Sequence, residues 1–164
     1  MKIFKEVLSY LIIILIVVVI KTFIIAPVKV DGTSMLPTLK HNDVLLLKKY
    51  DRSFNRFDIV VVKYKNAKIV KRIICLHCES LEIKNNKLYI NHSYIEDFDP
   101  DIKTADFYLE DLGYSVIPDD CYFVMGDNRY NSTDSRIIGV VNKDEIVGVT
   151  NFRIFPFSNF GTFK

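Results

Sequence analysis

The stretch VDGTSMLPTL, residues 30–39, places a serine in a setting typical of a nucleophile. Ser34 lies between a turn at Gly32 and a run that begins at Met35. A serine hydroxyl is a weak nucleophile until a neighbouring base accepts its proton, and histidine most often supplies that base. The chain has three histidines, and none lies in a segment that otherwise indicates catalysis: His41, His77 and His92.

A lysine offers an alternative base. In AKIVKRIICL, residues 67–76, the alternation of a strand puts Lys71 on one face with Ile69 and Ile73. An amine on an apolar, inward-facing surface pairs with an acid or loses its proton, because desolvation lowers its pKa by about 3 to 5 units. Lys71 is therefore a candidate base for Ser34. The same alternation also allows a lysine that extends from a strand edge into solvent.

A third stretch, VMGDNRYNSTDSR at residues 124–136, follows a predicted strand and is too polar to form a core. On its own it is typical of a solvated turn. Together and in this order, the three stretches resemble the bacterial type I signal peptidases, membrane-anchored serine proteases with a Ser/Lys dyad. The single N-terminal anchor resembles the Gram-positive form of that family. The resemblance covers nearly the whole chain, through GTSMLPTL, RFDIVVVK, IVKRII, YFVMGDNRYNSTDSRIIGVV and FRIFPFSNFG.

The resemblance implies a role for each matching residue. Ser34 corresponds to the nucleophile, Lys71 to the general base and Ser132 to a hydroxyl that orients the lysine. The Ser34 backbone N–H is expected to serve the oxyanion hole. Four charged residues correspond to groups that brace the site, with the last two paired: Arg72, Asp127, Asp134 and Arg136. The turn of the nucleophile and the substrate pocket are expected to use Gly32, Met35, Pro37 and Ile69.

The segment after the lysine departs from the family pattern. Family members commonly read Gly-Leu-Pro-Gly-Asp there, whereas this chain reads Cys75-Leu76-His77-Cys78-Glu79. The turn must be built differently, and a shifted substrate preference follows as an expectation. The cysteines and the histidine resemble half of a metal site, but no second ligand pair stands at the usual spacing, so no metal and no cofactor are expected.

The N-terminal segment VLSYLIIILIVVVIKTFIIA, residues 7–26, carries Lys21 as its only charge. Twenty helical residues rise about 30 Å, enough to cross a bilayer. A cleaved signal peptide would show an A-x-A site after the apolar run, and a core helix would show a polar face; neither is present. Lys2 and Lys5 favour a cytoplasmic N-terminus, with the catalytic domain on the extracytoplasmic side.

The remainder of the chain predicts a mostly β fold, an antiparallel, barrel-like catalytic domain with a smaller inserted β-hairpin subdomain. The expected divisions are residues 1–26 for the cytoplasmic end and anchor, 27–76 with 114–164 for the catalytic domain, and 77–113 for the insertion. Asn85-Asn86 predicts a two-residue hairpin turn. The predicted strands are Val28–Asp31, Asp43–Lys49, Asp58–Tyr64, Lys68–Leu76, Leu81–Lys84, Lys87–Asn91, Ser115–Ile117, Tyr122–Met125 and Glu145–Ile154.

The resulting hypothesis is a membrane-bound peptidase that cuts exported preproteins after small residues of an A-x-A signal, with a pilin-type substrate set as one possibility. The expected partners are such preproteins and the lipid bilayer. A net charge of +2 with 26% charged residues gives no reason to expect nucleic acid. Two alternatives stay open: an assembly factor that binds exported surface proteins without cutting them, and a self-cleaving cytoplasmic repressor with the same Ser/Lys chemistry.

Overall fold

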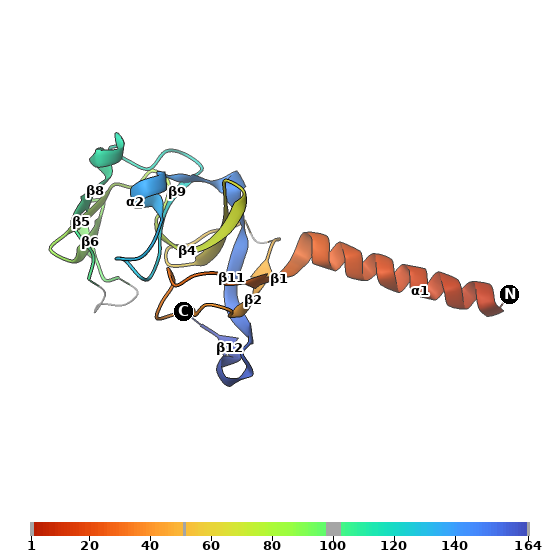
Figure 1. Ribbon diagram of the computed structural model, residues 1–164. Coiled ribbons are helices and arrows are strands. Elements are labelled where there is room, and N and C mark those ends of the chain that lie inside the picture. The colour runs from red at the N-terminus through yellow and green to blue at the C-terminus, as the bar shows by residue number, and fades with distance from the viewer. Residues whose placement is uncertain (1, 51, 98–102, 164) are drawn as a thin grey trace.

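The computed structural model describes residues 2–50, 52–97 and 103–163. Figure 1 shows a β-rich body from which one long helix projects at the N-terminal end. Residues 98–102, in the middle of the predicted insertion, lie outside the described residues, as do Met1 of the predicted cytoplasmic end and Lys164 at the end of the predicted catalytic domain.

The projecting helix α1, Lys2–Val19, continues into a π-helical turn, η1, Ile20–Ile24. The span Ile3–Ile24 has a mean hydropathy of 2.8, long and apolar enough to cross a membrane. The side chains of this span are exposed in the isolated chain, because no other part of the described chain packs around it. The Nζ of Lys49 donates to the carbonyls of Lys21 (3.1 Å) and Thr22 (3.0 Å), which ties the end of the helix to the body.

The body is built on an antiparallel eight-stranded sheet in the order β1-β2-β11-β3-β4-β9-β10, with β12 paired to β11. This confirms the predicted mostly β, antiparallel class. The strands are β1 Ile25–Lys29, β2 Val44–Lys48, β3 Ile59–Tyr64, β4 Ala67–Cys75, β9 Cys121–Met125, β10 Val141–Asn142, β11 Ile146–Phe155 and β12 Gly161–Thr162.

A second sheet, in the order β7-β6-β5-β8, lies within the predicted insertion. Asn85 and Asn86 have φ of 51° and 60°, as a type I′ turn requires, so the predicted hairpin turn is confirmed. Apolar side chains of β5, β6 and β8 form one core cluster with those of β4 and β9. The insertion therefore packs onto the main sheet. Its strands are β5 Leu81–Lys84, β6 Lys87–Ile90, β7 Ser93–Ile95 and β8 Phe107–Tyr108.

Some predicted elements differ from the structure. Residues 115–117 form no strand; only Ile117 pairs, accepting from the N–H of Cys78 and donating to the carbonyl of Glu79, both at 2.8 Å. Only four residues lie between Gly113 and Pro118. Pro118 cannot continue the pairing, because proline has no N–H to donate. The strands and the α-helix that the prediction missed are all short and so carry little periodicity: β7, β8, β10, β12 and the single-turn helix α2, Ser135–Ile138.

Strand β4 lies between β3 and β9, and its last six residues are all buried. Lys71 is 3% exposed and Arg72 is 1% exposed, although they point to opposite faces. Both faces are covered because apolar clusters pack on each side of the strand. Alternation in the sequence could not have distinguished this arrangement from a strand with one wet face. The solvent-exposed reading of Lys71 is wrong.

Candidate active site

The turn that carries Ser34 follows β1 and is held against the body by buried side chains. Met35 is 1% exposed and Leu39 is fully buried, and both belong to a core cluster beneath the turn. The N–H of Leu39 donates to the carbonyl of Met35 at 2.8 Å, which closes one helical turn. Gly32 has a φ of +97°, a backbone conformation that suits glycine. Ser34 is left half-buried at the surface of the turn.

Lys71 reaches Ser34 from the middle of β4. Its Nζ lies 2.6 Å from the Ser34 Oγ, although the two residues are 37 positions apart in the chain. Burial lowers the pKa of the Lys71 amine to about 8, against the opposing pull of the Asp134 and Asp127 carboxylates. An amine with such a pKa is partly neutral near physiological pH and can accept the proton of the hydroxyl.

The loop between β9 and α2 fixes the turn from the other side. The N–H of Asn128 donates to the carbonyl of Ser34 at 3.0 Å, and its side-chain amide donates to the carbonyl of Thr33 at 3.2 Å. The Asn131 amide donates to the Thr33 Oγ1 at 3.1 Å. Sequence reasoning did not single out either asparagine. The signal available was their place in the polar GDNRYNS run, because asparagine amides commonly hydrogen-bond nearby backbone.

Gly126 lies where this loop passes closest to the nucleophile turn. A β-carbon at position 126 would lie well inside the contact distance of the Ser132 Oγ and of the Ser34 carbonyl oxygen. Only glycine leaves room for that approach. The Ser132 Oγ is buried there, and no hydrogen bond joins it to Lys71 among the described residues. The expected orienting contact from Ser132 to Lys71 is therefore not present as a hydrogen bond in this part of the chain.

Asp134 lies fully buried behind Ser132. Burial alone would raise the pKa of its carboxyl, but hydrogen bonds from Arg136 and from the N–H of Gly126 outweigh it and lower the pKa. The Arg136 guanidinium lies 2.8 Å from the carboxylate, so the expected pair is present. Asp134 also accepts from the N–H of Arg136 at 3.3 Å and begins α2 as its N-cap.

Arg72 and Asp127 form a second buried pair, with both side chains 1% exposed. The Arg72 Nε lies 2.9 Å from one carboxylate oxygen and its Nη2 lies 2.7 Å from the other. The Arg72 Nη1 donates to the carbonyl of Phe57 at 2.9 Å. Because a bidentate pair fixes both distance and orientation, it locks the β9–α2 loop to β4.

Arg129 is a further buried cation that sequence reasoning missed. Its guanidinium lies 2.8 Å from the Asp97 carboxylate and donates to the Thr104 Oγ1 at 2.8 Å and to the carbonyl of Gly126 at 3.2 Å. Asp97 and Thr104 belong to the segment that contains the insertion. Arg129 therefore connects that segment to the loop beside the nucleophile.

The residues expected to shape the substrate pocket lie in different places. Met35 is in the core below the turn, so it supports Ser34 from beneath. Ile69 is half-buried against the apolar cluster on the Lys71 face of β4. Pro37 follows a cis peptide bond and borders an open hollow of about 340 Å³ beside the turn. The hollow is lined by Leu36, Pro37, Lys103, Asp127, Asn128, Arg129 and Tyr130.

Comparison with known proteins gives one consistent family. The profile of "Signal peptidase, peptidase S26" matches residues 3–155. Signal peptidase I S of Bacillus subtilis strain 168 is 41% identical over 150 residues, 85% of this chain and 82% of its own length. Signal peptidase I of Bacillus amyloliquefaciens is 40% identical over 160 residues, 92% of this chain and 86% of its own length.

A solved structure is similar as well. The crystal structure of a signal peptidase I from Enterococcus faecalis V583 superimposes with a TM-score of 0.55 at 31% identity, covering 59% of this chain and 96% of that one. The family and the apolar N-terminal helix together indicate a membrane-anchored serine protease. The alternative of a non-cleaving assembly factor receives no support from these relatives. The resemblance read from the sequence is confirmed, and the chain belongs to the signal peptidase family, peptidase S26.

Proposed function

We propose that Ser34 and Lys71 form the catalytic dyad of a signal peptidase that hydrolyses exported preproteins after small residues of an A-x-A signal. One observation carries the proposal: a lysine amine that is 3% exposed lies 2.6 Å from a serine hydroxyl. Burial that lowers the pKa of the amine to about 8 supports its use as a base.

In this mechanism the neutral Lys71 amine accepts the Ser34 proton as Oγ attacks the scissile carbonyl. The Ser34 backbone N–H stabilises the oxyanion of the tetrahedral intermediate. The ammonium then returns the proton to the nitrogen of the leaving amine, and an acyl-Ser34 ester remains. A water molecule, deprotonated by the same amine, attacks the ester, and its collapse releases the acid and restores Oγ–H.

The buried pairs around the dyad act as positioning groups in this proposal. Asp134 and Asp127 raise the pKa of Lys71 against the effect of burial, so the amine stays close to the working range of pH. Ser132 packs beside Gly126 and lowers the pKa of Asp134, and we assign its hydroxyl to positioning that carboxylate, which in turn raises the pKa of Lys71. Arg72 and Arg136 hold the two acids in place.

The membrane anchor sets the substrate class. A peptidase tethered by α1 meets preproteins that are themselves tethered by an apolar signal segment, and shared tethering raises their effective concentration. Lys5 before the apolar run favours a cytoplasmic N-terminus and an extracytoplasmic dyad, with the helix in contact with lipid. The altered segment at residues 75–79 favours a narrow substrate set, such as pilin-type surface proteins.

Variants of the dyad test the proposal on a membrane-tethered A-x-A substrate in proteoliposomes. Ser34→Ala should reduce cleavage to background, and Lys71→Ala should lower kcat by about 100- to 10,000-fold because general-base catalysis is lost. Lys71→Arg should fail equally, since a guanidinium does not give up its proton.

Two exposed residues supply matched controls: Lys68→Ala, on β4, for the Lys71 variants, and Ser115→Ala for Ser34→Ala. Cleavage should be unchanged in both. Retained turnover in either Lys71 variant would remove the lysine from the mechanism. Retained turnover in Ser34→Ala would refute the nucleophile.

A further inference from the structure

The insertion leaves and rejoins the main sheet through two neighbouring segments, residues 76–79 after β4 and residues 117–120 before β9. Backbone hydrogen bonds join them, from the N–H of Cys78 to the carbonyl of Ile117 and from the N–H of Ile117 to the carbonyl of Glu79, both 2.8 Å. The two segments are therefore held side by side by the backbone, independently of the side chains they carry.

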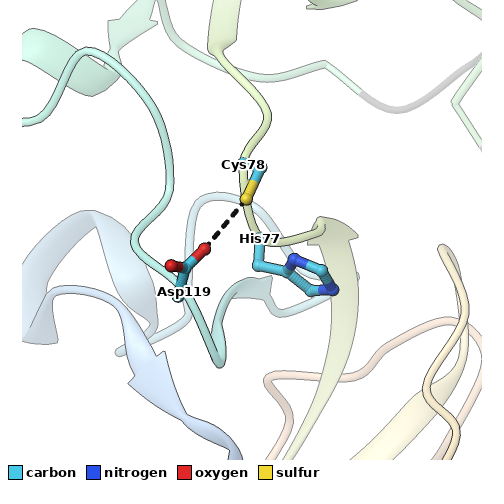
Figure 2. A group of neighbouring side chains, drawn as sticks. All are labelled: His77, Cys78 and Asp119. Carbon is cyan, nitrogen blue, oxygen red and sulfur yellow. Dashed lines mark hydrogen bonds between the residues drawn. The ribbon is translucent and has the colours of Figure 1, made fainter.

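Three side chains of different chemistry meet on these paired segments. The ligand atoms of His77, Cys78 and Asp119 all lie within 4.8 Å of one another. The Cys78 Sγ lies 3.0 Å from an Asp119 carboxylate oxygen, across 41 positions of sequence. Figure 2 shows the sulfur directed at that carboxylate, while the His77 imidazole extends on the other side of the sulfur. All three side chains are exposed and accessible from solvent.

A thiolate, an imidazole nitrogen and a carboxylate oxygen are the three protein ligand types that Zn²⁺ binds. At zinc–ligand distances of about 2.0 to 2.3 Å, tetrahedral geometry places the ligand atoms roughly 3.3 to 3.8 Å apart. The present spacing reaches that range by small rotations of exposed side chains. Three protein ligands leave a fourth position for water.

We propose that His77, Cys78 and Asp119 form a zinc-binding site at the base of the insertion. On binding, Zn²⁺ takes the place of the thiol proton between Sγ and the carboxylate, and that proton leaves to solvent. No redox change is involved, since zinc stays divalent.

One surrounding contact favours the site. The His77 ring makes an edge contact with the Tyr122 ring, at 6.2 Å and 88°, which restricts its orientation before a metal arrives. Because the backbone and one ligand are already ordered, less conformational freedom is lost on binding.

The position of the site gives it a structural role distinct from the dyad. The ligands come from both sides of the insertion's attachment to the sheet, so the metal links the entry and exit of the second sheet to each other. Lys71 lies four residues before Cys75 on β4, and none of the three ligands touches the dyad among the contacts of the described chain.

The experiment measures Zn²⁺ binding by titration calorimetry, and Co²⁺ binding by absorption, with the full chain in detergent micelles under reducing conditions. We expect one metal per chain and, with Co²⁺, the sulfur-to-cobalt charge-transfer band of a thiolate ligand. His77→Ala, Cys78→Ser and Asp119→Asn should each weaken Zn²⁺ affinity by more than about 100-fold, the upper range found for outer-shell partners.

Each ligand variant has a matched control that keeps the residue type elsewhere: His92→Ala, Cys121→Ser and Asp120→Asn. These should bind Zn²⁺ as the unaltered chain does. Protease resistance of the insertion should rise on adding Zn²⁺ in the unaltered chain and in the controls, and not in the ligand variants. Absence of saturable binding, wild-type affinity in any ligand variant, or a cobalt spectrum without the sulfur band would overturn the site.

Discussion

At the scale of single residues, the chemistry depends on how one amine is solvated. A lysine in water has a pKa near 10.4 and is almost fully charged at neutral pH. Burial on β4 lowers the pKa of Lys71 to about 8, and the Asp134 and Asp127 carboxylates limit the fall. The amine thus stays neutral often enough to act as a base while remaining basic enough to hold the proton it takes.

This balance predicts a pH dependence of cleavage. Lys71 is the base only when neutral, so kcat/KM should rise with pH and level off above the pKa of about 8. The measurement is initial-rate kinetics on a tethered substrate without titratable groups near the cleavage site. Lys68→Ala, which alters an exposed lysine of the same strand, should give the same profile. A kcat/KM that stays level across pH 8 would contradict the assignment.

At the scale of elements, the site exists where β4, the nucleophile turn and the β9–α2 loop meet. Three kinds of contact hold them: asparagine amides on the turn, the Arg72–Asp127 pair on β4, and the close approach at Gly126. The arrangement depends on the buried Arg72–Asp127 pair, because loss of either partner leaves an unpaired charge in the interior.

Gly126→Ala should separate the loop from the nucleophile turn. The added methyl group meets the Ser34 carbonyl and the Ser132 side chain, and backbone has to move. A displacement of about 1 Å at a catalytic group lowers the rate by about 100-fold, so we expect a fall of that order in kcat.

Gly113→Ala is the matched control. Its φ of +83° strains any added side chain at the backbone, which Gly126→Ala does not do, but the added methyl group meets nothing within 4 Å. Its kcat should stay at the level of the unaltered chain. Thermal unfolding of both variants should be measured alongside. An unchanged kcat in Gly126→Ala would show that the close approach at Gly126 is not needed to position the nucleophile turn.

At the scale of the whole molecule, the helix α1 and the β body have different roles. The body contains the proposed dyad and the charged pairs around it, and α1 contributes no residue to these contacts. The helix instead confines the body to a membrane surface. Confinement of enzyme and substrate to one surface raises the effective concentration without changing the chemistry.

Removal of residues 2–24 tests this division. The shortened chain should leave the membrane fraction and cleave a short soluble A-x-A peptide with unchanged kcat/KM. Its kcat/KM on a bilayer-tethered preprotein should fall by about 100-fold or more, because the gain from shared tethering is lost. A matched chimera with an unrelated apolar helix should recover cleavage of the tethered preprotein. Equal activity of the shortened chain on both substrates would contradict a tethering role for α1.

The sequence by itself determined the features that contiguous residues encode. The apolar span, the Asn85-Asn86 hairpin, most of the long strands and the residue types around Ser34 and Lys71 all follow from local pattern. Each of these features depends on the conformational preference of a short segment, and residues adjacent in the sequence set that preference. The short strands and α2 were not predicted, because a segment of four residues or fewer shows no clear hydrophobic period.

Tertiary structure set the actual contacts between groups far apart in the sequence, including the one that the sequence had suggested between Ser34 and Lys71. Strand register brings Lys71 to Ser34 over 37 positions, Arg72 to Asp127 over 55 and Cys78 to Asp119 over 41. It also buries both faces of β4, which keeps the Lys71 amine out of water, and leaves Ser132 without a hydrogen bond to Lys71 in the described chain. These outcomes depend on side-chain packing between segments far apart in sequence, and a one-residue shift of register would turn every such side chain to the opposite face.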